Sequence, residues 1–212
     1  MAKRYAPFQF KQFALAHQQS AHKIGTDAIV LASWLNGASA RQILDFGSGC
    51  GVLSFISAQR FPNAQILGIE VDEASYLESV ANKVQNPFAH RLNFLHQDIQ
   101  EFEPTTKFDL IVSNPPYVAD GEAQDLDPEI REWEPGAALY AGPDGLAALR
   151  RIATGAGPYL KPGGLLALEV GLGQATYIME LLENTGEFRT VRVCRDLSGR
   201  ERVVLAHGEM TD

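Results

Sequence analysis

The sequence predicts a doubly wound α/β fold, in which a mostly parallel seven-stranded sheet ends in an antiparallel C-terminal hairpin. From residue 41 to residue 186, short apolar runs alternate with segments of helical character. Such alternation is typical of a parallel sheet that is covered by helices on both faces. Residues 189–207 instead form two apolar runs around the turn Asp-Leu-Ser-Gly, which is typical of a hairpin at a sheet edge.

The individual elements follow from the periodicity of apolar residues. The predicted strands before the hairpin are short apolar runs that end at acidic, amide or glycine residues: 41–47, 64–72, 91–98, 108–114 and 163–171. The predicted helices have apolar residues three and four positions apart: 26–37, 52–61, 73–86, part of 142–160, and 174–186. We expect Thr26 or Asp27 to be the N-cap of the first helix and Gly37 to end it.

The domain organisation predicted from this pattern is simple. Residues 1–25 do not follow the alternation, and we expect an irregular N-terminal extension there. Residues 26–212 contain no repeat, low-complexity tract or long linker, which predicts a single domain. A content of 45% hydrophobic and 21% charged residues is ordinary for a soluble globular domain.

Charge and cysteine usage narrow the functional classes. A formal net charge of −8 argues against a broad surface that coats nucleic acid. A local basic cluster near the start remains, either as a nucleic-acid contact or as a solvated end: Lys3, Arg4, Lys11 and Lys23. Two isolated cysteines, no Cys-x-x-Cys spacing and scattered histidines predict no metal site. The start lacks an apolar signal core and no segment is long enough to span a membrane, so we expect a cytoplasmic protein.

A glycine-rich loop, "DFGSGCG" at residues 45–51, joins the first predicted strand to a helix. Gly47, Gly49 and Gly51 allow a tight turn and a close approach of a ligand to the backbone. Glu70 lies 19 residues beyond Gly51, at the end of the next strand, where its carboxylate can accept hydrogen bonds from ribose hydroxyls. A dinucleotide and S-adenosylmethionine both fit a glycine loop with a ribose acid.

The loop spacing favours S-adenosylmethionine. A dinucleotide loop has the spacing G-x-G-x-x-G/A, whereas this loop has G-x-G-x-G and is preceded by Asp45. A carboxylate there suits a cationic methionyl group better than a pyrophosphate, so a dehydrogenase is the weaker interpretation. Asp98 and Ile99 follow the third strand, where adenine would bind. Asp98 can also be a helix N-cap, and the two roles are compatible.

The fourth predicted strand ends in Asn114, Pro115, Pro116 and Tyr117. The Asn114 side-chain oxygen and the Pro115 carbonyl can each accept one N–H of a planar NH2 group. This frees the nitrogen lone pair to attack a sulfonium methyl, which is catalysis by positioning and electrostatics. The two prolines restrict the backbone, and Tyr117 offers a flat face to a base or amide. The alternative is that the prolines only end the strand and Tyr117 packs in the core.

Together these motifs resemble the class I S-adenosylmethionine-dependent methyltransferases over residues 26–206. Asn-Pro-Pro-Tyr is similar to the motif of the subgroup that methylates nitrogen on planar groups. The resemblance implies a Rossmann-like methyltransferase fold, S-adenosylmethionine as cofactor, and catalytic roles for residues 114–117. It also implies that Asn114 binds the cofactor and that Thr26 and Asp27 lie near its methionyl end, although helix capping explains Thr26 and Asp27 equally well.

The resemblance divides along the chain. Residues 8–35 and 86–102 resemble bacterial methyltransferases that modify an adenine next to the anticodon of a valine tRNA. Residues 131–153, 160–174 and 195–204 resemble the methyltransferases that modify glutamine in peptide-chain release factors. The change near residues 113–120 suggests a recombined or engineered chain. The basic cluster favours tRNA as the substrate, with a release factor as the alternative. A scaffold that binds cofactor without turnover is a third interpretation.

Overall fold

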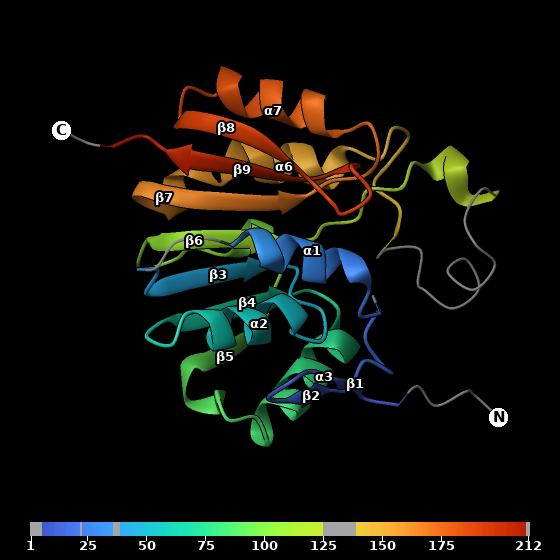
Figure 1. Ribbon diagram of the computed structural model, residues 1–212, viewed down its shortest axis with the longest axis vertical. Coiled ribbons are helices and arrows are strands. Elements are labelled where there is room, and N and C mark those ends of the chain that lie inside the picture. Colours follow the sequence, from blue (N-terminus) through green and yellow to red (C-terminus); the bar gives the residue numbers. More distant parts are fainter. Residues whose placement is uncertain (1–5, 22, 36–38, 125–138, 211–212) are drawn as a thin grey trace.

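The computed structural model describes residues 6–21, 23–35, 39–124 and 139–210 and contains one large sheet of seven strands (Figure 1). Its strand order is β5-β4-β3-β6-β7-β9-β8. The strands are β3 Gln42–Phe46, β4 Gln65–Glu70, β5 Leu92–His96, β6 Phe108–Ser113, β7 Leu160–Glu169, β8 Phe188–Arg195 and β9 Glu201–Gly208. The α-helices are α1 Thr26–Trp34, α2 Val52–Arg60, α3 Glu73–Val84, α6 Ala147–Gly155 and α7 Ala175–Asn184. Short 3-10 helices are η1 Ala89–Arg91, η2 Ile99–Glu101, η3 Asp120–Gln124 and η4 Gly157–Tyr159.

The strand directions confirm the predicted fold class. Strands β5, β4, β3, β6 and β7 are parallel, β9 is antiparallel to β7, and β8 is antiparallel to β9. The strand predicted from residue 163 begins earlier, at Leu160. It does so because Phe108 pairs with Leu160 while Leu110 pairs with Leu165, so extra residues of β7 are accommodated at a bulge.

Side-chain alternation along the strands builds two apolar layers. One layer contains Ile43 and Val112 together with buried residues of α1 and α2. The other contains Leu44 and Ile111 together with buried residues of α6 and α7. Figure 1 shows α1 and α2 in front of the sheet and α6 behind it. Both faces of the sheet are therefore covered by helices. A ligand can bind only where the strands end.

The N-terminal extension is more ordered than predicted. Its described part contains a two-stranded antiparallel sheet of β1 Phe8–Gln9 and β2 Ala14–Leu15. Phe10 and Phe13 stack at 4.5 Å between ring centroids. Phe13 and Leu15 are buried in the layer that holds α1 and α2. Apolar packing of these rings gives the segment a fixed course, which the lack of regular periodicity did not indicate.

The start of α1 also differs from the expectation. Gly25 is the N-cap, and no side chain caps the helix. The Thr26 hydroxyl instead lies 3.4 Å from a carboxylate oxygen of Asp27. Neither Thr26 nor Asp27 is therefore the N-cap, because the helix begins one residue earlier than the capping pattern suggested. Gly37 and the first two residues of the basic cluster, Lys3 and Arg4, lie outside the described residues.

Candidate active site

A cavity of about 350 Å3 lies at the carboxyl ends of the parallel strands, where β3 has β4 on one side and β6 on the other. This is the switch point at which open α/β sheets bind ligands. The cavity brings together seven of the residues predicted to bind cofactor or acceptor: Gly47, Gly49, Glu70, Ile99, Asn114, Pro115 and Pro116. Ala21 from the N-terminal extension and Arg151 from α6 also line it.

The glycine loop needs glycine for its backbone. Gly47 and Gly49 have φ angles of +69° and +55°, in the left-handed region that side chains disfavour. The Gly47 N–H donates to the Ile69 carbonyl at 2.9 Å, which fixes the loop over β4. A Cβ atom at Gly47 would meet nothing within 4 Å. The backbone there borders open space, so a ligand can approach it closely.

Glu70 ends β4 with its carboxylate at the cavity wall and only 8% exposed. One carboxylate oxygen accepts the Gly49 N–H at 2.7 Å, and the other accepts the Asp72 N–H at 2.8 Å. Both oxygens are therefore held in place, and each keeps a lone pair for another donor. This geometry fits a ribose with two neighbouring hydroxyls.

Asp45 and Gly51 do not line this cavity. Asp45 is fully buried, and its carboxyl group accepts a hydrogen bond from the Ser54 hydroxyl at 2.6 Å. Burial raises the pKa of Asp45 to about 7. Gly51, with φ +93°, begins α2, and a Cβ atom there would lie 2.7 Å from the Phe55 ring and 3.0 Å from Phe94. Asp45 and Gly51 thus support the glycine loop on the side away from the cavity. Direct contact of either residue with the cofactor stays a prediction.

Asp98 and Thr26 also lie outside the lining of the cavity. Asp98 is the N-cap of η2 and accepts the Gln100 N–H at 2.9 Å. It thereby fixes the next residue, Ile99, which does line the cavity. Thr26 is exposed at the start of α1. The adenine role of Asp98 and the methionyl role of Thr26 remain predictions.

Asn114 follows β6 directly, half-buried at the cavity wall. Among the described residues, its side-chain amide has no hydrogen-bond partner. The preceding residue, Ser113, donates its hydroxyl to the Phe46 carbonyl at 2.8 Å and so ties β6 to β3. The Asn114 amide is therefore held on a rigid strand end with its oxygen free for a ligand.

Tyr117 lies beyond the two prolines and faces α1 rather than the cavity. Its hydroxyl donates to a carboxylate oxygen of Asp27 at 3.3 Å. Burial raises the pKa of Tyr117, and the nearby charges of Glu169 and Asp27 act in the same direction. The ring thus reaches from residues 114–117, which we call the acceptor loop, to the first helix, α1.

The backbone after Tyr117 is held by Gln174, a residue for which no role was predicted. Gln174 donates its side-chain N–H2 group to the Tyr117 carbonyl at 2.9 Å and to the Gly145 carbonyl at 3.2 Å. Its side-chain oxygen accepts the Gly171 N–H at 2.9 Å. Gly145 has φ +70°, and a Cβ atom there would lie 2.4 Å from the Tyr117 carbonyl oxygen. One glutamine and one glycine therefore set the exit of the acceptor loop.

Residues 16–21, which we call the strap, cross the site next to the glycine loop and are held by α3. The Glu78 carboxylate accepts three consecutive backbone N–H groups, from Gln18, Gln19 and Ser20, at 2.7 to 3.2 Å. Asn82 exchanges two hydrogen bonds with the backbone of Ala16, at 2.8 and 2.9 Å. The strap ends at Ala21, whose N–H donates to the Ser75 hydroxyl at 2.9 Å. One face of α3 thus holds a wall of the cavity in place.

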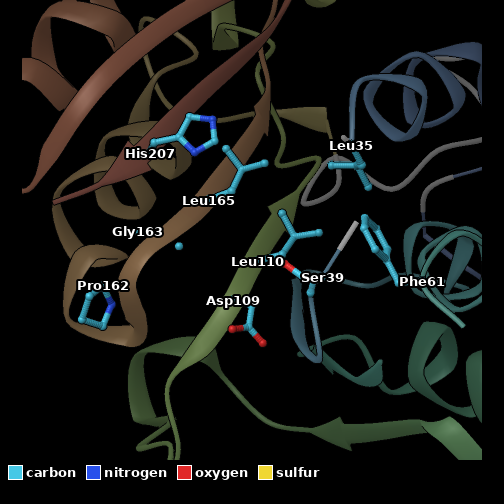
Figure 2. A pocket seen from close by; sticks show the side chains of 11 residues that line it. Leu35, Ser39, Phe61, Asp109, Leu110, Pro162, Gly163, Leu165 and His207 are labelled. Carbon is cyan, nitrogen blue, oxygen red and sulfur yellow. The ribbon is translucent and has the colours of Figure 1, made fainter. Parts of the chain in front are cut away.

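A second cavity, of about 260 Å3, lies at the other end of the parallel strands, where β6 and β7 begin (Figure 2). Figure 2 shows Asp109 on β6 and Pro162 and Gly163 in the first residues of β7. The Asp109 carboxylate accepts the N–H groups of Arg41 and Gln42 and is paired with Lys161 at 2.9 Å. The Asp109 carboxylate thus binds the backbone at the start of β3 and the side chain of Lys161 on β7, which is a structural role. The first cavity is therefore the candidate active site.

No helix in the described part of the chain combines the length and apolarity needed to cross a membrane. No group of three or more His, Cys, Asp or Glu side chains within those residues could hold a metal ion. The cytoplasmic location stays a prediction.

Comparison with known proteins settles the family. Residues 14–130, more than half of the chain, match the Methyltransferase small domain family. The chain belongs to the methyltransferase small domain family. The predictions of a methyltransferase and of S-adenosylmethionine as its cofactor are confirmed at the level of this family.

Members of two kinds resemble the chain in sequence. The release factor glutamine methyltransferase of Geobacter sulfurreducens is 37% identical over 181 residues, which cover 84% of this chain and 62% of the relative. The tRNA1(Val) (adenine(37)-N6)-methyltransferase of Glaesserella parasuis is 44% identical over 110 residues, which cover 52% of this chain and 47% of the relative. The chain spans about 46% to 62% of the length of the first curated relatives it matches.

A solved structure agrees with the fold. The 16S rRNA N2 G1207 methyltransferase of T. thermophilus, in complex with AdoMet and guanosine, superimposes with a TM-score of 0.68 at 24% identity. The superposition covers 96% of this chain and 50% of that chain. This likeness supports the Rossmann-like fold, whereas the family rests on the sequence match.

The hypothesis of a recombined or engineered chain is not supported. The release factor relatives align over 178 and 181 residues, far more than the part of the chain that follows residue 120. Their similarity therefore extends well into the N-terminal half. Two related families within one fold explain the divided resemblance without a join.

Proposed function

We propose that the protein transfers a methyl group from S-adenosylmethionine to the NH2 nitrogen of a planar group, and that this group is the side-chain amide of a glutamine in a protein. The observation that carries the proposal is the free Asn114 amide at the wall of the cavity that Glu70 and the glycine loop form. The residues present fit the cofactor. Glu70 has two fixed oxygens for a ribose, and the Gly47 backbone borders open space.

In this proposal the chain itself acts by positioning. When bound, S-adenosylmethionine supplies a methyl group on a sulfonium that departs as a neutral thioether. The Asn114 side-chain oxygen accepts one N–H of the target, and the Pro115 carbonyl accepts the other. The target nitrogen then points its lone pair at the methyl carbon. Transfer would form the new C–N bond as the C–S bond breaks, and the proton of the alkylated nitrogen would leave afterwards to solvent.

Two observations favour a protein glutamine as the acceptor. The release factor relatives align over 77% to 84% of the chain, whereas the tRNA relatives align over 52% to 54%. Lys23, one of the basic residues that favoured tRNA, donates its ammonium group to the carbonyls of Gln18 and Ser20, at 3.2 and 2.6 Å. Its charge braces the strap, so it is a weaker argument for binding RNA.

A tRNA adenine is the second candidate, because the tRNA relatives are the more identical of the two over their shorter span, at 40% to 44%. Transfer of labelled methyl from S-adenosylmethionine to purified release factor and to total tRNA separates the candidates. We expect label that stays with protein and resists ribonuclease. If ribonuclease releases the label, the acceptor is a tRNA adenine and not a protein glutamine.

The Asn114 side chain and the Pro115 carbonyl, which we call the acceptor clamp, can be tested separately. Asn114→Ala should lower methyl transfer by about 10²- to 10³-fold, because one of two positioning contacts is lost. Calorimetry with S-adenosylhomocysteine should show nearly unchanged affinity. Equal turnover in the variant would refute the clamp. Binding of S-adenosylhomocysteine without transfer to either substrate would favour the scaffold interpretation.

A further inference from the structure

Glu169 is a buried carboxyl group to which the fold gives no partner. It is the last residue of β7 and is only 1% exposed. Neither of its side-chain oxygens has a hydrogen-bond partner among the described residues. An unpaired buried carboxyl group costs free energy, and a protein core gains nothing by keeping it. Such a group is therefore a candidate for a role in function.

The sheet register places Glu169 beside the acceptor clamp. Ser113 of β6 pairs with Leu168 of β7 in a parallel ladder. Asn114 and Glu169 are the next residues of the two chains, and neighbouring strands lie about 4.8 Å apart. Alternation along β7 turns Glu169 to the face of Ala167, which belongs to the layer that holds α1. Glu169 thus follows the strand next to the one that Asn114 follows, one position beyond the last paired residues.

The surroundings of Glu169 come from three elements. Asp27 belongs to α1, Tyr117 to the acceptor loop, and Arg202 to β9. Burial, with a smaller contribution from the Asp27 charge and against the opposing charge of Arg202, raises the pKa of Glu169 to about 9. Arg202 also lies 3.9 Å from the Asp196 carboxylate, which shares its charge. At neutral pH Glu169 therefore keeps its proton and can donate one hydrogen bond.

We propose that Glu169 recognises the substrate: its O–H donates to the carbonyl oxygen bonded to the same carbon as the target NH2 group. This inference rests on the proposed function. Asn114 and Pro115 account for the two N–H donors of a carboxamide, and Glu169 supplies the donor that its oxygen requires. The three residues together match the polar atoms of an amide and reject a lysine amine, which has no such oxygen.

The test uses Glu169→Leu and Glu169→Gln in the full chain, with purified release factor as the acceptor. Leucine removes the donor at similar volume, so the KM for release factor should rise at least tenfold while the affinity for S-adenosylhomocysteine stays within threefold. Glutamine restores a neutral donor and should recover at least half of that loss. A carboxyl group that is only structural would leave KM unchanged in both variants.

The pH profile separates the role further. Wild-type activity should fall as pH rises through about 9, because a deprotonated Glu169 cannot donate. The glutamine variant should lack this fall, and it gives a result even if the leucine variant does not fold. A wild-type protein that methylates release factor, with an unchanged KM in Glu169→Leu and an unchanged profile in Glu169→Gln, overturns this inference alone. A wild-type protein that binds S-adenosylhomocysteine but does not methylate release factor removes the proposed function, and this inference with it.

Discussion

Glu78→Gln is the substitution that tests how the strap is held over the cofactor cavity. The Glu78 carboxylate is only 7% exposed and accepts the Gln18 N–H on one oxygen and the Ser20 N–H on the other, each at 2.7 Å. The Gln19 N–H is shared between the two oxygens, at 3.1 and 3.2 Å. A glutamine side chain keeps one oxygen and turns an NH2 group toward a backbone donor.

The expected magnitude follows from these contacts. One charge-assisted hydrogen bond is lost and one donor is left facing another, which costs about 2–3 kcal/mol. That free energy corresponds to a roughly 30- to 150-fold weaker attachment of the strap. Because Ala21 at the end of the strap lines the cavity, the affinity for S-adenosylhomocysteine should fall by no more than the same factor.

Hydrogen exchange measures the strap directly. Amide protection at residues 16–21 should fall by about the factor above in Glu78→Gln. Protection of the sheet should not change. Glu180→Gln is the matched control, because Glu180 is exposed on α7, which packs in the other apolar layer. Unchanged protection of the strap in Glu78→Gln would refute this account of its attachment.

Three further substitutions test the parts of the site that are already defined. Gly51→Ala should lower the free energy of unfolding by about 2–4 kcal/mol in urea titrations. The reason is that Gly51 has a φ of +93° and that the new Cβ would lie 2.7 Å from Phe55. A loss below roughly 1 kcal/mol would contradict this packing. Gln174→Ala removes the donor that holds the Tyr117 carbonyl, so kcat should fall about tenfold with little change in affinity for S-adenosylhomocysteine. Weaker cofactor binding at unchanged kcat would show that Gln174 does not act by positioning the acceptor loop. Asp45 keeps its proton up to about pH 7 when folded but only to about 3.8 when unfolded, so the free energy of unfolding should fall as pH rises through this window. Asp45→Asn should flatten that slope, and the same slope in both proteins would assign it to other groups.

The elements of the fold were predictable because apolar periodicity is strong in this chain. The strand 64–72 and the helix 73–86 appear as β4 and α3 within a few residues. The early start of β7 was not predictable, since Pro162 and Gly163 signal a turn rather than a strand. The course of the extension was also hidden, because ring stacking between Phe10 and Phe13 leaves no period in the sequence.

The site was predictable where its residues follow the ends of strands. Gly47, Glu70 and Asn114 each end or follow a strand of the parallel sheet, and such ends meet at one edge. The buried position of Asp45 had a signal that was missed: it lies two residues after the buried Ile43, so alternation turns it inward.

Other contacts leave no local trace in the sequence. Glu78 looks like an ordinary acid on a helix, and only the folded structure shows that residues 18–20 lie against it. Gln174 holds the Tyr117 carbonyl, and Glu169 lies one strand away from Asn114, in each case more than 50 positions apart in the chain. Their roles depend on which strands become neighbours, and this is a property of the whole sheet rather than of a motif.

Calorimetric titration of S-adenosylhomocysteine into the wild-type protein and into Glu70→Ala tests the central claim most directly. The claim is that the cavity at the switch point binds S-adenosylmethionine with its ribose on Glu70. We predict saturable binding of one molecule per chain, and an affinity at least tenfold lower in Glu70→Ala, because the variant loses two fixed carboxylate oxygens. Equal affinity of the two folded proteins, or no binding by the wild type, would contradict the account.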